Sequence, residues 1–373
     1  MKDKCIWILA GEASGDVYGA ELATELKSLH PDVTIKGMGG VNMQRAGVDL
    51  IADTSELGVM GFIEVAKLYP TFMRLLKKMI DTAAEERPDV VVTIDYPGFN
   101  LRFAKAVHAL GIKTVHYVGP QVWAWGKKRL KTLPTFIDKL LVIFPFEMPI
   151  WQKTGIDVEF IGHPLVETLA KKRVKIERSK DTILLLPGSR KSELDRILTP
   201  MLNTAKALKK KRPQLRFVIS TPREKIRNMV LNEITKANLG FAINVTCGDT
   251  ETWLQQATCG LAASGTVTVQ AAILGLPVVS IYKMNPLSLF LMRMLIKLPY
   301  FTMANIISDK VVYEEFLQGK VKPSILVPAV ERILPTGERA ELVVTDMKEM
   351  VDKLGGESTV ANNAATSILS LIK

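Results

Sequence analysis

The chain has 373 residues, of which 47% are hydrophobic and 23% are charged, proportions typical of a globular protein that exclude a disordered one. Its formal net charge of +11 favours an anionic partner, such as a phosphate, a nucleic acid or an acidic membrane surface. No apolar run approaches the roughly 20 residues of a spanning helix, and the short one at residues 5–9 resembles a first strand more than a signal peptide. The three cysteines lack metal-ligand spacing, which predicts a reduced, cytoplasmic protein.

A series of short apolar runs predicts β-strands, mostly separated by helical patterns. The runs occupy residues 6–10, 90–94, 113–118, 139–143, 183–186, 216–220, 259–263 and 277–281. This alternation predicts α/β domains with parallel sheets. Because a basic, apolar-poor stretch lies at 171–180, we expect one domain over residues 1–168 and a second over 169–345. A last helical pattern, 346–373, can pack back on the first domain.

The first strand is followed by a turn of small and acidic residues, Ala10–Asp16, and then by a helical pattern. This Rossmann-like opening lacks G-x-G-x-x-G, and Glu12 and Asp16 would repel a pyrophosphate. Acidic and hydroxyl groups suit the hydroxyls of a sugar better. The turn is therefore predicted to bind a hydroxylated acceptor.

An apolar stripe at helical spacing follows, with basic residues beside it; its members are Phe72, Leu75, Leu76 and Met79. One interpretation is an ordinary core helix, and the other is a surface that lies on anionic lipid. The nearly apolar segment 287–296 allows the same two interpretations. The basic net charge favours membrane contact for both segments.

Asp95 follows the buried strand 90–94, at the strand end where open α/β sheets bind their ligands. We expect it to act as a general base, although a helix-capping aspartate would have the same pattern. The loop 118–126 is bounded by glycine and proline and carries Trp123 and Trp125, so it is predicted to line a site. His163 precedes the basic stretch, and both a structural and a functional role remain open for it.

In the second half, strand 183–186 runs into a turn that contains Gly188, Ser189 and Arg190. Backbone N–H groups at the start of the next helix and the arginine would converge on a phosphate, although glycine and serine also occur in such turns for geometry alone. The turn 264–266 repeats the pattern and would bind a diphosphate. No D-x-D motif or His/Cys cluster is present, so no metal ion is expected and Arg190 with the helix termini must carry the charge.

Nucleic-acid binding is the main alternative for so basic a chain. Lysine and arginine cluster at 127–131 and 209–212, but neither cluster contains aromatic residues at a recognisable motif spacing. Solvated helix faces account for both clusters, and no nucleic-acid partner is expected.

Seven ordered motifs resemble those of one family, the lipid-A-disaccharide synthases, which are inverting glycosyltransferases of the GT-B fold. The motifs are AGEASGD at 10–16, ID at 94–95 with FN at 99–100, HYVGPQVWAW at 116–125, FPFE at 144–147, FIGH at 160–163, LPGSR at 186–190 with Glu193, and SGT at 264–266. Asn305 and EEFLQ at 314–318 extend the resemblance. It implies two Rossmann-like, doubly wound domains that face each other across a cleft.

The resemblance also implies an activity. Such an enzyme transfers 2,3-diacylglucosamine from its UDP conjugate to the 6-hydroxyl of 2,3-diacylglucosamine 1-phosphate, releases UDP and needs no cofactor. It would be peripheral to the cytosolic face of the inner membrane, bound to anionic lipids, and self-association into a homo-oligomer is compatible with this picture. Alternatives are another UDP-sugar enzyme, such as a 2-epimerase or a peptidoglycan-precursor transferase, and a non-catalytic, membrane-associated nucleotide-binding protein.

The resemblance implies a catalytic base, a set of donor-binding residues and a set of acceptor-binding residues. Asp95 would be the base. The donor would contact Gly188, Ser189, Arg190, Glu193, Ser264, Gly265, Thr266, Gln270 and Asn305. The acceptor would contact Glu12, Ser14, Gly15, Asp16, Asn100, Gln121, Trp123 and His163. One departure is Gln270, where the family usually has a glutamate that would meet the ribose hydroxyls.

Overall fold

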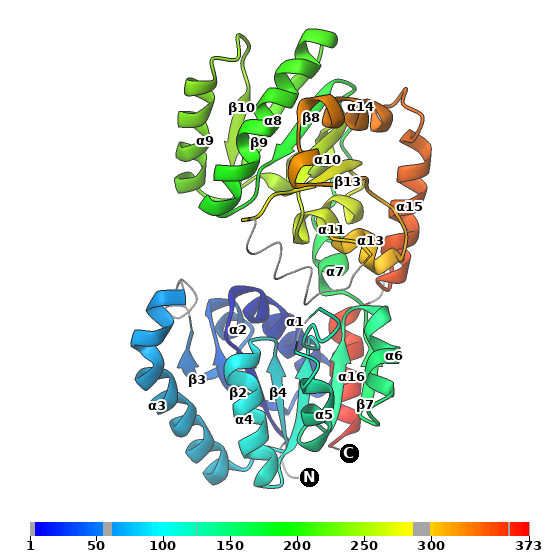
Figure 1. Ribbon diagram of the computed structural model, residues 1–373. Coiled ribbons are helices and arrows are strands. Elements are labelled where there is room, and N and C mark those ends of the chain that lie inside the picture. The colour runs from blue at the N-terminus through cyan, green and yellow to red at the C-terminus, as the bar shows by residue number, and fades with distance from the viewer. Residues whose placement is uncertain (1–3, 55–61, 125, 286–298, 357–358, 373) are drawn as a thin grey trace. The chain divides into compact units, whose positions relative to one another are not determined.

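The computed structural model describes residues 4–54, 62–124, 126–285, 299–356 and 359–372. The chain divides into two compact units, Met1–Pro164 with Ser358–Lys373, and Leu165–Glu357 (Figure 1). Each unit contains one parallel sheet, which confirms the predicted α/β class. The chain thus leaves the first unit directly after Pro164, ahead of the basic stretch at 171–180.

The sheet of the first unit has the strand order β3-β2-β1-β4-β5-β6-β7, and all its pairs are parallel. Its strands are β1 (Cys5–Ala10), β2 (Thr34–Gly39), β3 (Asp49–Asp53), β4 (Val90–Ile94), β5 (Lys113–Tyr117), β6 (Lys139–Val142) and β7 (Asp157–Phe160). The order reverses between β1 and β4, where Ala10 lies opposite Ile94. The loops that follow these two strands therefore begin side by side.

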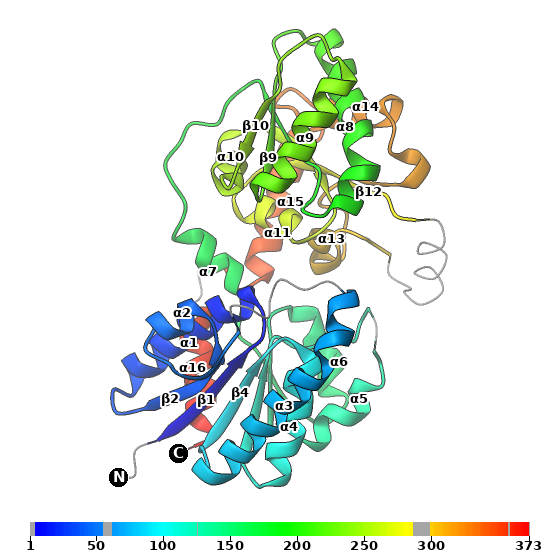
Figure 2. The same ribbon diagram turned by 90° about the vertical axis from the view of Figure 1, so that its left-hand side faces the viewer.

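Helices cover both faces of this sheet, with α1 and α16 on one face and α3 and α4 on the other (Figure 2). The helices of the unit are α1 (Ala13–Leu29), α2 (Val41–Arg45), α3 (Phe62–Glu86), α4 (Pro97–Ala109), α5 (Arg129–Thr132), α6 (Met148–Gln152) and α16 (Val360–Ser370). Short 3₁₀ turns cover Leu133–Thr135 and Pro145–Glu147. The last helical pattern in fact forms two helices, of which α16 packs along α1 and α15 (Ala340–Lys353) belongs to the second unit.

The core of the first unit shows why its strands are almost continuously apolar. Trp7 and Leu9 point to the side of α3 and α4, where the Trp7 ring stacks on Phe103 with centroids 6.4 Å apart. Ile8 points to the opposite side, where it lies against Gly19 of α1. A parallel strand covered on both faces needs apolar side chains at both alternating positions, and β1 supplies them.

The stripe on α3 belongs to this core. Leu76 and Met79 are 5% and 0% exposed and pack with Trp7 and Phe99. Half-buried Phe72 and Leu75 pack against the same cluster, and the Phe72 ring meets Phe99 edge-on at 5.2 Å. The predicted membrane contact is therefore wrong for this stripe, because the apolar face of α3 covers the sheet. The second predicted membrane segment, 287–296, lies outside the described residues.

The second unit repeats the arrangement with the order β10-β9-β8-β11-β12-β13, which reverses between β8 and β11. Its strands are β8 (Thr182–Leu186), β9 (Arg216–Thr221), β10 (Asn244–Cys247), β11 (Cys259–Ala263), β12 (Val278–Tyr282) and β13 (Glu315–Leu317). Its helices are α7 (Pro164–Ala170), α8 (Lys191–Lys211), α9 (Glu224–Ala237), α10 (Thr250–Gln256), α11 (Thr266–Ile273), α13 (Met303–Ser308), α14 (Pro323–Ile333) and α15, with a 3₁₀ turn at Gln318–Lys320. Helices α8, α9 and α14 pack in a row, and α11 packs with α10, α13 and α15.

The core position of the α3 stripe can be tested by truncation. We expect Met79→Ala to lower the free energy of unfolding by about 2–5 kcal/mol, because it opens a cavity among packed side chains. Lys78→Ala, at an exposed position next to it, should change the value by no more than about 0.5 kcal/mol. Urea denaturation followed by circular dichroism measures both, and equal small effects would contradict the core assignment.

Candidate functional site

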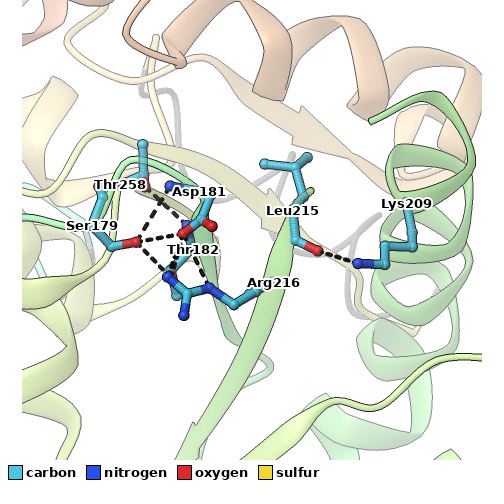
Figure 3. Close-up of polar contacts among 7 residues, drawn as sticks. All are labelled: Ser179, Asp181, Thr182, Lys209, Leu215, Arg216 and Thr258. Atoms are coloured by element: carbon cyan, nitrogen blue, oxygen red, sulfur yellow. Dashed lines mark hydrogen bonds and ion pairs between the residues drawn. The ribbon is translucent and has the colours of Figure 1, made fainter. Parts of the chain in front are cut away.

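One cavity of the second unit lies at the edge of its sheet where a ligand site is not expected. This cavity of about 810 Å³ opens at the amino ends of β8 and β9, whereas open α/β sheets bind ligands at the carboxyl ends. Its polar groups already serve the fold: Arg216 donates two hydrogen bonds to Asp181, and Lys209 donates to the carbonyl of Leu215 (Figure 3). The Arg216 contacts hold the pKa of Asp181 below its ordinary value. We therefore interpret the polar contacts around this cavity as contributions to the stability of the fold, not as a ligand site.

A second cavity, of about 620 Å³, lies at the carboxyl edge of the same sheet, where the strand order reverses between β8 and β11. It brings together every predicted donor residue except Asn305. Those that line it are Gly188, Ser189, Arg190, Glu193, Ser264, Gly265, Thr266 and Gln270. Two turns that are distant in sequence thus form opposite walls of one pocket.

One wall is the turn Gly188–Arg190, which is arranged differently from the prediction. The carboxylate of Glu193 accepts hydrogen bonds from the N–H groups of Ser189 (2.9 Å) and Arg190 (3.2 Å). These two amides were expected to hold a phosphate, but the protein's own carboxylate engages them. The side chain of Arg190 is 78% exposed and its guanidinium lies 3.4 Å from Glu193, so it can still meet an anion.

The other wall is the start of α11. Gly265 and Thr266 are exposed here, and the Ser264 hydroxyl donates to the carbonyl of Phe301 (3.1 Å). The first N–H groups of a helix have no partner within the helix, and its N-terminus carries a partial positive charge. This wall can therefore bind the phosphate groups of a ligand through its backbone.

Asn305 has a different role from the predicted donor contact. It is fully buried, its amide donates to the carbonyl of Tyr313 (2.8 Å) and to Glu315 (3.2 Å), and its oxygen accepts from the Tyr313 N–H (2.9 Å). Glu315 in turn accepts hydrogen bonds from the N–H groups of Phe301 and Thr302. Asn305 holds these segments together instead of lining the pocket.

In the first unit, Glu12 and Asp95 lie at the corresponding switch point, after β1 and β4. Asp95 and Tyr96 both have left-handed backbone, with φ of 45° and 46°. Burial raises the pKa of Asp95, and burial together with the charge of Asp95 raises the pKa of Glu12. A carboxylate whose pKa is shifted toward neutrality is better suited to accept a proton than an ordinary surface aspartate.

The side chain of Asn100 hydrogen-bonds to the backbone of the Asp95 turn. The side chain is fully buried, and its Nδ2 donates to the carbonyls of Leu9 (3.2 Å), Ile94 (2.9 Å) and Asp95 (2.9 Å). The prediction of an acceptor contact for Asn100 is therefore wrong, because its amide joins the carboxyl ends of β1 and β4. It orients the backbone of Asp95 instead.

Asp16 and Gly15 also serve the fold. The Asp16 carboxylate is buried and accepts from the N–H groups of Gly40 (2.7 Å), Asn42 (3.0 Å) and Met43 (3.1 Å), which begin α2. A Cβ on Gly15 would lie 3.3 Å from the Ala10 side chain, so this glycine allows close packing of α1 on β1. Of the predicted acceptor residues in this turn, only Glu12 and Ser14 are exposed to a ligand.

The loop after β5 presents the remaining predicted acceptor residues. Gln121 is exposed, and half-buried Trp123 donates from Nε1 to Glu147 (3.1 Å) and packs edge-on against Phe146. His163 is buried beside the Phe144 ring, and burial lowers its pKa to about 4, so it is neutral at pH 7. Trp125 lies outside the described residues.

Within the described ranges, no group of three histidine, cysteine, aspartate or glutamate side chains is placed to hold a metal ion. None of the helices in the same ranges combines the length and the apolar character needed to cross a membrane.

Comparison with known proteins decides the family. The family model described as lipid-A-disaccharide synthetase matches residues 6–369. A lipid-A-disaccharide synthase of Syntrophus aciditrophicus is 35% identical over 381 residues, covering 100% of this chain and 99% of that protein. One of Myxococcus xanthus is 33% identical, covering 98% and 97%. The chain belongs to the lipid-A-disaccharide synthase family. It is accordingly a glycosyltransferase of lipid A biosynthesis.

Solved structures confirm the GT-B architecture for this synthase. The UDP-GlcNAc 2-epimerase of Neisseria meningitidis bound to UDP-GlcNAc superimposes with a TM-score of 0.66 at 13% identity, covering 99% of both chains. The calicheamicin glycosyltransferase CalG4 superimposes with a TM-score of 0.59 at 13% identity, covering 100% of this chain and 99% of that one. At such identities the likeness concerns the fold alone, so it does not favour the epimerase alternative.

The sequence predictions missed part of the lining of the second cavity. Ser220, near the carboxyl end of β9, and Pro222, which follows that strand, line the cavity, as do Gly248, Thr250 and Glu251, which follow β10. Ser220 donates to Asp249 (3.0 Å) and exchanges a hydrogen bond with Thr250 (2.8 Å). Pro222 after β9 and Gly248 after β10 were a readable turn signal, because carboxyl ends of neighbouring parallel strands share one edge.

Glu147 belongs to the FPFE motif, but the sequence alone assigned no role to it. Its carboxyl group is 1% exposed, Oε2 is buried without a hydrogen-bond partner among the described residues, and burial raises its pKa to about 8. At pH 7 the group is therefore largely neutral. In this form it holds the indole of Trp123 in the predicted acceptor loop.

Because the pKa of Glu147 is raised, replacing this residue with glutamine should increase the free energy of unfolding by an amount that depends on pH. Below the unfolded pKa near 4.5 the carboxyl group is protonated in both the folded and the unfolded state, so it does not lower the free energy of unfolding. As the pH rises toward 8, burial of this group lowers the free energy of unfolding progressively. Glutamine mimics the protonated acid and still accepts from Trp123, so Glu147→Gln should stabilise the protein by about 1–3 kcal/mol at pH 8 and by almost nothing at pH 4.5. Urea denaturation at both pH values measures this; a gain independent of pH would contradict the assignment.

Proposed function

We propose that the protein transfers 2,3-diacylglucosamine from UDP-2,3-diacylglucosamine to the 6-hydroxyl of 2,3-diacylglucosamine 1-phosphate. The products are the β-1,6-linked disaccharide 1-phosphate and UDP. Membership of the synthase family over the whole chain carries this proposal. The pocket at the switch point of the second unit supports it, because it combines an exposed guanidinium with a helix N-terminus.

On the donor side, the diphosphate would bind between Arg190 and the start of α11. A planar guanidinium can make two parallel hydrogen bonds to phosphate oxygens. Gln270, one turn into α11 and on the pocket wall, would hydrogen-bond the ribose hydroxyls without the charge of the usual glutamate.

On the acceptor side, Asp95 would remove the proton from the 6-hydroxyl. The oxygen then attacks the anomeric carbon from the face opposite UDP, the bond between that carbon and the diphosphate oxygen breaks, and the configuration inverts. Arg190 and the α11 N-terminus would stabilise the charge that develops on the leaving UDP, which makes a metal ion unnecessary.

A direct assay tests the proposal. The purified protein is incubated with both acylated substrates and EDTA, and the products are identified by mass spectrometry. We expect one disaccharide 1-phosphate and one UDP per turnover, with the chelator present. Release of UDP without acceptor, or loss of activity in EDTA that Mg²⁺ restores, would contradict the transfer reaction or its metal independence respectively.

The role of Asp95 gives a sharper test. Asp95→Asn should keep the fold and the affinity for UDP but lower kcat by about 100-fold to 10,000-fold, because a general base is removed. Asp81→Asn, which neutralises an exposed carboxylate on α3, is the matched control and should leave kcat unchanged. A near-normal rate in Asp95→Asn would contradict the assignment of Asp95 as the general base.

We further propose that the enzyme is attached peripherally to the cytosolic face of the inner membrane through basic residues on α3 and α4. Arg74, Lys77, Lys78 and Arg102 are exposed there. The guanidinium of Arg102 lies 6.0 Å from the Phe72 ring centroid and contacts Met73, so the two helices form one basic face. Each basic residue near an anionic surface contributes about 1 kcal/mol.

Reversing two of these charges should separate attachment from folding. The double variant Lys77→Glu, Lys78→Glu should bind phosphatidylglycerol vesicles at least about 10-fold more weakly, as each change removes an attraction and adds a repulsion. Lys206→Glu with Lys210→Glu on α8 makes the same change in net charge on the other unit and should have a much smaller effect. Vesicle cosedimentation measures both; equal losses would contradict the α3–α4 face.

A further inference from the structure

We propose that Glu193 is a positioning residue of the donor pocket. Its carboxylate fixes the turn Gly188–Arg190 so that the Arg190 guanidinium faces the diphosphate of the UDP-sugar, and it does not touch the ligand itself. This inference rests on the proposed function, and it replaces the direct donor contact that the sequence predicted for Glu193.

Two backbone N–H groups converge on a single oxygen of Glu193. Oε2 accepts from Ser189 at 2.9 Å and from Arg190 at 3.2 Å, and Glu193 is the third residue of α8. A glutamate at the third helical position that bonds back to the residue before the helix is a capping-box contact. The second bond, to Ser189, extends this contact into the turn, so the carboxylate fixes the backbone on both sides of Ser189.

Gly188 shows that the turn is shaped around this carboxylate. Its φ is +102°, and a Cβ built on it would lie 2.3 Å from Oε2 and 2.9 Å from the Cβ of Glu193. Any side chain at this position would displace the carboxylate. The turn is braced from the other side as well, because Arg223 donates to the Ser189 carbonyl at 3.4 Å.

The charge of Glu193 is balanced within the turn. Two amide donors, the N-terminus of α8 and the Arg190 guanidinium surround it, so it does not present a free negative charge to a diphosphate. The side chain of Glu193 is 20% exposed, while that of Arg190 is 78% exposed. We therefore expect the ligand to contact the arginine. The glutamate fixes the backbone from which the arginine side chain extends.

A double-mutant cycle on UDP affinity tests this coupling. By calorimetry, Arg190→Ala should weaken UDP binding by about 10-fold to 100-fold, through loss of charged hydrogen bonds. Glu193→Ala should weaken it by about 10-fold, because Arg190 is no longer held toward the ligand. The double variant should be no more than about 2-fold weaker than Arg190→Ala alone, and Glu193→Gln, which keeps an acceptor oxygen, should recover part of the loss.

The controls separate positioning from general damage. Asp195→Ala removes an exposed carboxylate of the same helix and should leave UDP affinity unchanged. Gly188→Ala displaces the carboxylate while keeping Glu193, and should reproduce the loss seen in Glu193→Ala. Circular dichroism and thermal melting check the fold, and if Glu193→Ala does not fold, Glu193→Gln and Gly188→Ala take its place in cycles with Arg190→Ala.

Two results would overturn the inference while leaving the proposed function intact: losses that add in the double variant, or tighter UDP binding by Glu193→Gln, which would mean that the carboxylate competes with the phosphate. A wild-type protein that binds no UDP would refute the proposed function, and the inference would fall with it.

Discussion

In each unit the strand order of a parallel sheet reverses once, between β1 and β4 in the first and between β8 and β11 in the second. Right-handed crossovers then place successive helices on opposite faces on either side of the reversal. The loops that leave the two central strands diverge, and an opening remains at the carboxyl edge of the sheet. Glu12 and Asp95 lie at the reversal of the first unit, and the turns at 188–190 and 264–266 line the cavity at the reversal of the second.

At both reversals a polar side chain in the first turn of the following helix holds the backbone of the preceding turn. Asn100, in α4, binds the carbonyls beneath the Asp95 turn, and Glu193, in α8, binds the amides of the Arg190 turn. Tyr96 adds a steric constraint, since a Cβ on Gly11 would lie 2.1 Å from its ring. Left-handed backbone at Asp95 and Tyr96 is unfavourable for residues with a side chain and persists only where neighbours fix it. The backbone at the two reversals is thus held by the buried amide of Asn100 and the partly exposed carboxylate of Glu193.

Charge in this enzyme is divided between the surface and the interior. The excess of basic residues is exposed, as on α3 and α4, whereas burial keeps two titratable side chains of the first unit, His163 and Glu147, largely neutral at pH 7. Burial lowers the pKa of His163 to about 4 and raises that of Glu147 to about 8. A neutral interior costs less than a buried charge, and it leaves Asp95 and Glu12 as the acidic groups at the switch point.

The sequence alone determined the two-sheet architecture, the base candidate, the turns of the pocket and the family, because apolar runs, small-residue turns and motif spacing are local signals. Only the tertiary structure decided which polar residues remain free for a ligand. Asp16 bonds to the N-cap residue of a helix, Gly40, 24 residues later, and Asn100 bonds to a carbonyl 91 residues earlier. Whether the α3 stripe faces a sheet or a membrane was likewise settled by Trp7 and Phe99. In each case the competing partner lies far along the chain, and a local pattern contains no information about it.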